Sequence, residues 1–269
     1  MFPPRSRKWL ALGGAAAVTA AAWVVTLRNA AGMSAKMPMP GGWSMSMAWM
    51  AMADQSGVQR AAMFMTMWTV MMVAMMLPSV IPVVMLHRGL LHARAARDAE
   101  AQSAEAGPSG SNLLLLVGYF AVWAAFGGFA YVIGISVAGA VMRSASLSRA
   151  VPVAAGVTLA AAGLYQLTRW KQICLSHCRS PLEFFSRHRI RTAADSFMFG
   201  VHHGAHCAAC CWALMVIQLA LGIMSVPLMM AVAGVIFLEK QWRYGQKMAV
   251  WVGIAAMAGG AFLIGRALI

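Results

Sequence analysis

Long apolar runs, separated by short polar links, dominate this chain. Seven of them approach the length at which a helix crosses a bilayer: residues 9–27, 61–86, 113–137, 151–168, 205–222, 226–242 and 248–268. Lipid offers no hydrogen-bond partners to the backbone, so runs of this length favour helices. The pattern predicts an all-α fold, a polytopic transmembrane helix bundle of about seven spans, in which residues 1–269 form a single membrane domain.

Basic residues are concentrated in alternate links between these runs. Arg5, Arg7 and Lys8 precede the first run, and the link at 169–197 is the most basic. Since cytoplasmic segments accumulate Lys and Arg, this asymmetry predicts a cytoplasmic N-terminus, a cytoplasmic loop at 169–197 and an outer loop at 28–60. A basic start before an Ala-rich run also describes a signal peptide. We expect an uncleaved first helix, because the run is long enough to span.

The composition excludes an ordinary soluble domain. Hydrophobic residues make up 61% of the 269 residues and charged residues only 10%, whereas a soluble domain carries about a quarter charged residues. The formal net charge of +14 is typical of basic cytoplasmic loops, and no stretch interleaves basic and aromatic residues as a nucleic-acid groove does. We expect an integral protein of a bacterial inner (plasma) membrane, in contact with the lipid bilayer and with no nucleic-acid partner.

Methionine is the residue type that departs most from an ordinary composition. Fourteen of the 24 methionines lie in residues 33–52 and 63–76, the outer loop and the second run. The thioether is a soft, neutral ligand that suits Cu(I) in an oxidising compartment. The candidate ligands are Met45 and Met47 in the loop, and Met63, Met67, Met71, Met72, Met75 and Met76 in the run. The alternative is that these flexible side chains only fill gaps between helices.

A second group of candidate ligands lies in residues 202–211, which hold three His and three Cys. Because the residues that follow are apolar, we expect this group at the cytoplasmic mouth of the fifth span. Imidazole and thiolate hold soft and borderline metals, although a buried free Cys also behaves as a small hydrophobe. On a helix most of these side chains share one face. The candidates are His203, His206, Cys207, Cys210 and Cys211.

The basic loop contributes three further candidates, spaced so that they share one helix face: Cys174, His177 and Cys178. The loop leads into the fifth span, so the two groups can fold back together into one cytoplasmic site. Glu239 lies at the inner end of the sixth run. We expect it to pair with Lys240 or Arg243, or else to orient a His ligand.

The predicted topology sorts these ligands by side, with methionine outside and cysteine on the reducing cytoplasmic side. A route for Cu(I) across the membrane requires that division, so we expect a copper-handling protein that transports, acquires or buffers Cu(I). We expect no enzyme activity: the chain has no Gly-x-x-x-x-Gly-Lys-[Ser/Thr] phosphate loop, and its seven acidic residues form no catalytic pair. Two alternatives stay open. One is a membrane subunit or assembly factor of a redox or cuproenzyme complex, which could hold haem, and the other is a zinc site.

Several motifs in order resemble the DUF2182 family of predicted metal-binding integral membrane proteins. They are GGWSMSMAWM, MxxWxxMMxAMMLPS, YQLTRWKQICLSHCRSP, GxxHGxxCxxCCWALM and LEK, and together they cover about residues 40–240. The resemblance implies a helical membrane fold, a metal site, and a small soluble or periplasmic metal-binding partner. It implies functional roles for the Met and Trp residues of 43–76 and for Cys174, Cys178, Cys207, Cys210 and Cys211. The histidines of 202–206 fall outside that implied set.

Overall fold

The computed structural model of the chain describes residues 5–33, 36–50, 55–98, 108–179 and 192–269. Part of the predicted basic loop, residues 180–191, lies outside the described residues. The described part is helical almost throughout, as the apolar runs predict. Its β-structure is a small two-stranded hairpin.

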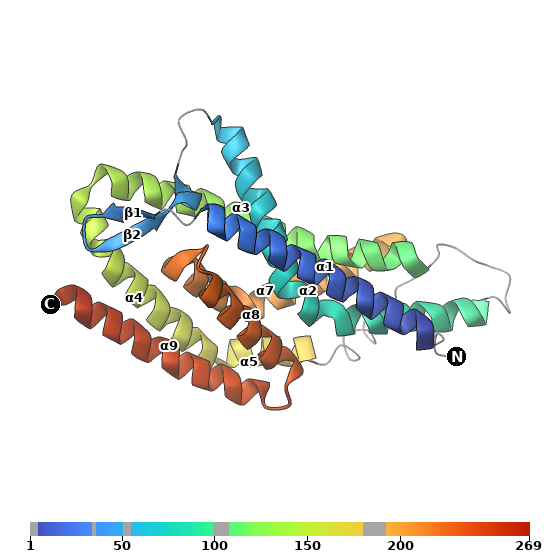
Figure 1. Cartoon of the computed structure of the whole chain (residues 1–269). Helices are drawn as coiled ribbons and strands as arrows, with labels where there is room; N and C mark the ends of the chain where they lie inside the picture. Colours follow the sequence, from blue (N-terminus) through green and yellow to red (C-terminus); the bar gives the residue numbers. More distant parts are fainter. Residues whose placement is uncertain (1–4, 34–35, 51–54, 99–107, 180–191) are drawn as a thin grey trace.

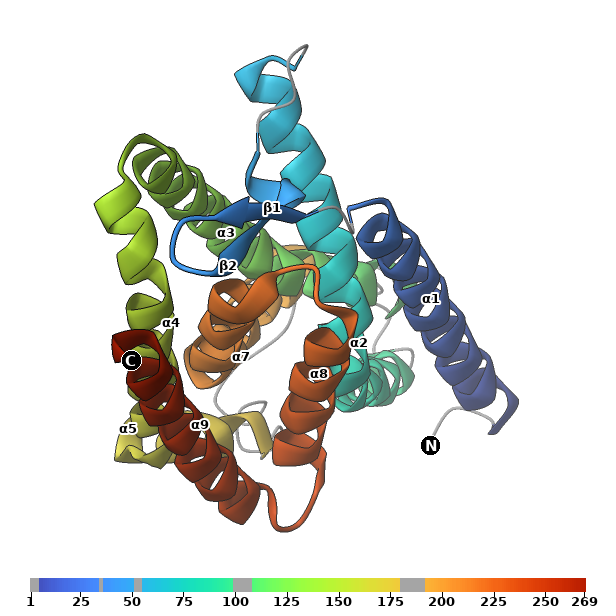
Figure 2. The ribbon, with the colours of Figure 1, turned by 60° about the vertical axis from the view of Figure 1, so that its left-hand side comes forward.

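Eight helices follow one another along the described chain. They are α1 (Arg5–Gly32), α2 (Gly57–Asp98), α3 (Pro108–Arg143), α4 (Ala145–Leu167), α5 (Arg169–Arg179), α7 (Ala193–Gly222), α8 (Val226–Gln241) and α9 (Gly245–Leu268). Figure 2 shows α7 and α8 in the middle of the bundle, with α2, α3, α4 and α9 around them and α1 outermost beside α2. Helix α7 therefore has neighbours on several sides, and many of its residues are buried.

Six of the described helices are long and apolar enough to cross a membrane: α1, α2, α3, α4, α7 and α9. The protein is therefore an integral membrane protein. The remaining predicted span, 226–242, is the helix α8, but α8 has only 16 residues. At about 1.5 Å per residue it is about 24 Å long, shorter than the roughly 30 Å hydrocarbon core. The structure thus gives six candidate spans where the sequence predicts about seven.

Two helices extend well beyond the apolar runs that predict them. α2 continues through Pro78 and Pro82 as one helix that changes direction along its length (Figure 1). α7 begins at a capping box, in which Thr192 and Asp195 each accept a backbone N–H of the other. This cap fixes the start of the helix about three turns before residue 205. As a result, residues 202–211 lie near the middle of α7 and not at the mouth of a span.

Glycines let two pairs of helices come into backbone contact. A Cβ at Gly200 of α7 would overlap the backbone of Leu115 on α3, and a Cβ at Gly118 would overlap Phe197. The pair α4 and α9 meets in the same way, at Gly163 and neighbouring glycines. Small residues at helix contacts are what association in lipid favours. The α3–α7 contact is important for the site, because it holds the backbone of α7 in place where residues 202–211 lie.

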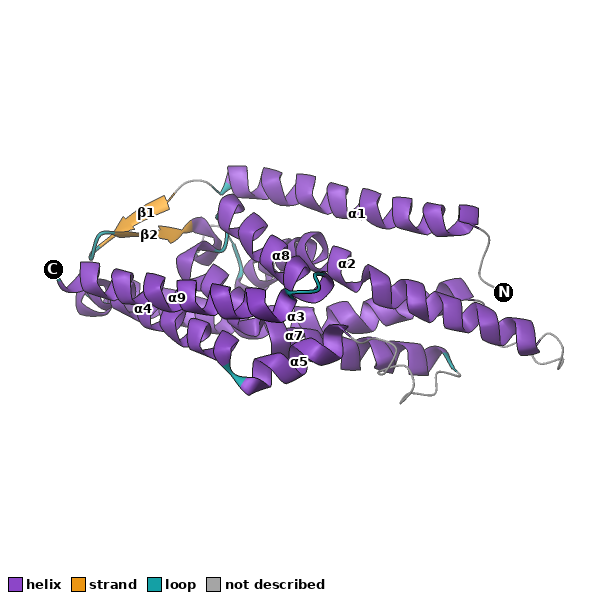
Figure 3. Ribbon diagram, turned by 90° about the horizontal axis from the view of Figure 1, so that it is seen from below, coloured by secondary structure: helices purple, strands orange, loops and turns teal. Residues whose placement is uncertain are grey.

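The hairpin joins β1 (Lys36–Met39) to β2 (Trp43–Ser46), and the short 3-10 turn η1 (Met47–Trp49) follows. The Nε1–H of Trp43 donates to the carbonyl of Ser148 at 2.9 Å, which ties the hairpin to the start of α4. Gly41 in the turn has φ +101 and lies against the backbone of Arg149, so both its conformation and its closeness require glycine. Figure 3 shows the hairpin at the end of the bundle opposite the N-terminus.

Candidate metal centre

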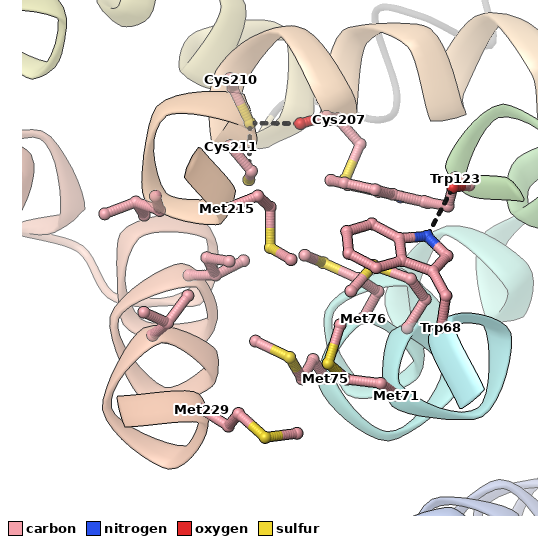
Figure 4. Close-up of a cluster of buried hydrophobic side chains, with 14 of the residues drawn as sticks. Trp68, Met71, Met75, Met76, Trp123, Cys207, Cys210, Cys211, Met215 and Met229 are labelled. Atoms are coloured by element: carbon pink, nitrogen blue, oxygen red, sulfur yellow. Dashed lines mark hydrogen bonds between the residues drawn. The ribbon is translucent and has the colours of Figure 1, made fainter. Parts of the chain in front are cut away.

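Three cysteines of α7 are completely buried in the middle of the bundle: Cys207, Cys210 and Cys211. The Sγ atoms of Cys210 and Cys211 lie 3.3 Å apart, and the Sγ of Cys210 lies 3.7 Å from that of Cys178 on α5. All five cysteines of the chain are free thiols. We call Cys178, Cys207, Cys210 and Cys211 the thiol cluster (Figure 4 shows the three from α7).

Helix α5 brings Cys178 to α7, which is the fold-back that the sequence predicts. α5 has 11 residues and buries the face that carries Lys171, Leu175 and Cys178. Its other face is open, with Trp170 and Ile173 exposed. The two terminal guanidinium nitrogens of Arg179 donate to backbone carbonyls around the end of α8. Nη1 donates to Glu239 at 2.8 Å, and Nη2 donates to Arg243 at 3.2 Å. The last residue of α5 thus holds it against α8.

Cys207 has two polar partners from neighbouring helices. The Nζ of Lys240 on α8 donates to its Sγ at 2.8 Å. The Oη of Tyr119 on α3 lies 2.9 Å from the same sulfur, and either atom can be the donor. Both partners are buried. A positive charge and a hydroxyl therefore face the sulfur, an environment that favours negative charge on it.

A buried ion pair joins α5 to α8 beside the thiol cluster. The Nζ of Lys171 on α5 donates to Oε2 of Glu239 at 2.6 Å and to the carbonyl of Cys210 at 2.6 Å. Gln166 donates to the other carboxylate oxygen at 3.1 Å. Glu239 is thus ion-paired, but with Lys171 and not with Lys240 or Arg243. Neighbouring residues on a helix point about 100° apart, so Lys240 faces Cys207 while Glu239 faces α5.

The charges of this ion pair also affect α5 itself. Burial is the largest effect and disfavours the charged form of Lys171, but the carboxylate of Glu239 together with Cys210 and Cys211 outweighs it, and the pKa of Lys171 is raised above its ordinary value. Burial raises the pKa of the Cys174 thiol, which the positive charge of Lys171 partly opposes. Cys174 is half-buried one turn before Cys178 and packs against the core. Cys174 therefore lies at the border of the thiol cluster.

The predicted histidines lie around the thiol cluster, and the described contacts do not place them within it. His203 is buried and stacks on Tyr119, with ring centroids 5.8 Å apart. His177 of α5 lies beside His206 of α7, with centroids 5.6 Å apart. The His177–His206 pair thus marks a more exposed approach to the cluster, since His177 is exposed and His206 half-buried.

The methionines of α2 line the interior on the other side of α7. Met67, Met71, Met72, Met75 and Met76 are buried, whereas Met63 is 55% exposed. The five buried methionines lie on two sides of α2, and both sides are covered because α2 packs against α1, α3 and α8. Figure 4 shows Met71, Met75 and Met76 turned toward Met215 of α7 and Met229 of α8. In the hairpin, Met45 is buried against Ala138 and Val141 of α3, and Met47 is half-buried.

Within the described part of the chain, no group of three or more His, Cys, Asp or Glu side chains is arranged to hold a metal ion. The sulfur donors of this region are thiols and thioethers, which are soft ligands of the kind that suits Cu(I).

A family model described as PpoB2, copper chaperone, matches residues 65–263. The chain belongs to this copper chaperone family. The match covers α2 through α9, which carry the thiol cluster and the buried methionines, and it leaves out the hairpin. No curated protein and no solved structure matches the chain. Copper handling by an integral membrane protein is therefore shown by the family and the fold together.

Several residues around the centre of this copper chaperone are absent from the sequence-based candidates. They are Tyr119, Gln166, Lys171, Met215, Gln218 and Met229. The signal for three of them was present: Gln166 and Gln218 are each the lone amide of an apolar run, and Lys171 is a cation beside one. Polar residues in membrane segments are rare and mark functional positions. Tyr119, Met215 and Met229 have no such signal, because aromatic and thioether side chains are ordinary in a membrane helix.

Proposed function

We propose that this membrane copper chaperone binds Cu(I) at the thiol cluster and hands it to a soluble or periplasmic metal-binding partner. The observation that carries the proposal is the close approach of unbridged, buried thiols from α5 and α7, at 3.3 and 3.7 Å. Thiolates and thioethers are soft ligands that suit Cu(I), and this interior offers both. The buried methionines of α2 extend the sulfur lining from the cluster toward the hairpin, and we propose that Met45, Met47 and the α2 methionines acquire the ion on the outer side.

Haem and zinc are less well supported by the same geometry. A haem needs an axial His that faces a roomy seam. His203 instead stacks on Tyr119, and a Cβ at Gly204, one residue on, would already lie 2.9 Å from the Tyr119 carbonyl. The α3–α7 contact therefore leaves no space for a macrocycle beside this histidine. A zinc site would leave the buried methionines without a role.

Metal analysis of the purified full-length protein tests the proposal. After expression with added copper, we expect about one or more copper ions per chain, no matching zinc, and no Soret band in the absorption spectrum. X-ray absorption at the copper edge should report Cu(I) with sulfur neighbours. A protein that carries zinc or haem in place of copper would refute the proposal.

The charges around the thiol cluster support the same proposal. Cu(I) between two thiolates leaves one net negative charge, which is costly inside a membrane protein unless it is compensated. Of the two buried lysines, Lys171 is already paired with Glu239. Lys240, at 2.8 Å from Cys207, is the one that can compensate the copper–thiolate charge.

Replacing Lys240 with methionine is expected to weaken Cu(I) binding by about ten- to a hundredfold. The reason is that a hydrogen bond to a charged group contributes about 1.5–3 kcal/mol, and tenfold corresponds to about 1.4 kcal/mol. Competition with a coloured Cu(I) chelator measures the affinity. Lys240→Arg should retain part of it, and Lys247→Met, at an exposed position of α9, should retain all of it. Unchanged affinity in Lys240→Met would rule out this role of the ammonium group.

A further inference from the structure

The buried interior between α2, α7 and α8 contains one amide among thioethers. Gln218 of α7 is fully buried, and its Nε2 donates to the Sδ of Met71 at 3.4 Å. Figure 4 shows Met215 of α7 near Cys211, Met229 of α8 at the far end of the same interior space, and Met71 of α2 between the two. Gln218 lies about two helical turns from Cys211 toward the outer end of α7. This group is therefore separate from the thiol cluster.

The amide of Gln218 is only half satisfied. Among the described residues, no donor reaches its Oε1, although the atom is buried. An unpaired amide oxygen is costly in a protein interior and more so within a membrane, where water does not replace the missing partner. Its single bond goes to a thioether, which is a weak acceptor. Packing alone would be better served by leucine at this position, so the amide indicates a ligand.

We propose that Met71, Met215 and Met229, with the amide of Gln218, form a second Cu(I) site. This proposal rests on the proposed copper function and adds a second binding site to the thiol cluster. Three neutral thioethers provide soft ligands for Cu(I), and an amide oxygen is a known weak additional ligand of copper centres. A flip of the Gln218 amide by about 180° exchanges the positions of Nε2 and Oε1, so that the unpaired oxygen points at an ion bound by Met71. The ion satisfies the oxygen that the protein leaves without a partner.

The position of this thioether site gives it a role as a relay. Met215 lies one turn from Cys211 and nearly one turn from Gln218 on α7, so it adjoins both sites. The site carries no anionic ligand, so it binds Cu(I) more weakly than the thiolates of the cluster. A weaker site in front of a stronger one passes an ion forward without trapping it. The thioether site therefore connects the outer methionines with the thiol cluster.

Titration of the purified full-length protein with Ag(I), a redox-inert analogue of Cu(I), tests the proposal. We expect about two ions per chain in the wild type. Cys207→Ala/Cys210→Ala/Cys211→Ala should keep about one weaker ion, and Met71→Leu/Met229→Leu with Gln218→Leu should also keep about one, the tighter. Leucine conserves the volume of methionine, so the variant with leucine at positions 71, 218 and 229 is expected to fold. Met230→Leu is the matched control, because Met230 is 59% exposed while Met229 is fully buried.

Methyl NMR with ¹³C-labelled methionine gives an independent readout in the triple cysteine variant. Ag(I) should shift the methyl signals of Met71, Met215 and Met229, each assigned by its leucine substitution, and leave that of Met230 in place. If the wild type binds one ion and the triple cysteine variant binds none, the second site is overturned while the proposed function stands. If the wild type binds no Ag(I) or Cu(I), both are overturned.

Discussion

The double variant Cys207→Ala/Cys210→Ala is expected to lose tight Cu(I) binding, by more than about a hundredfold, or about 2.8 kcal/mol. Cys207 is the thiol that faces Lys240, and Cys210 is the thiol that contacts both Cys178 and Cys211. Their removal leaves two thiols without the sulfur that lies between them. It also leaves the Lys240 ammonium without its partner, which further disfavours the remaining site.

Cu(I) affinity of this variant can be measured by chelator competition, and its membrane insertion by fractionation and circular dichroism. Alanine is small and apolar, so the helix should form and insert as in the wild type. Cys174→Ala is the matched control, because Cys174 is half-buried and lies outside the thiol cluster. If the double variant binds Cu(I) like the wild type, the thiol cluster is not the copper site.

Glu239→Ala is expected to destabilise the protein by about 3–5 kcal/mol, because it leaves a buried ammonium group unpaired. Lys171 is fully buried and donates to Glu239 at 2.6 Å, and Gln166 donates to the same carboxylate. α5 is held against α8 through this pair, so its loss should loosen α5 first. Thermal unfolding of the full-length protein in detergent, followed by circular dichroism, measures the effect as a lowered Tm.

A second substitution separates this effect from a general loss of packing. Lys171→Met/Glu239→Met removes both charges, and we expect it to be less destabilised than Glu239→Ala, because two apolar side chains replace a buried pair at little net cost. Lys247→Ala, at an exposed position, should leave the Tm unchanged. A Glu239→Ala protein with the Tm of this control would contradict the structural role of the pair.

The helices could be predicted from the apolar runs, but their ends could not. The fifth run begins near residue 205, whereas α7 begins at Ala193, because the capping box of Thr192 and Asp195 starts the helix among polar residues. Apolar content marks the part of a helix that is in contact with lipid or core, and caps mark where the helix begins. Because the predicted helix starts too late, the prediction places residues 202–211 at the end of the span, whereas they lie near the middle of α7.

The ligand types of the candidate site could be predicted, but not the polar groups around them. Cysteine and methionine carry their chemistry in the side chain, so their clusters are visible in the sequence. The pairing of Glu239 with Lys171 joins residues 68 positions apart, and only the docking of α5 on α8 brings them together. The expected partners were Lys240 and Arg243 because they are close in the chain, yet adjacent residues of a helix, such as Glu239 and Lys240, face different directions.

The placement of Cys178 on a short surface helix has a consequence for how fast copper leaves. Three sulfurs of the thiol cluster are fixed on α7, which is held by backbone contact with α3, while the fourth lies on α5, whose outer face is exposed. If Cu(I) binds at the thiol cluster as proposed, displacement of α5 by a docking protein would remove one sulfur and open the others, without any change in α7. The residence time of the ion would then be set by the displacement of α5, so a tight site could still release copper quickly.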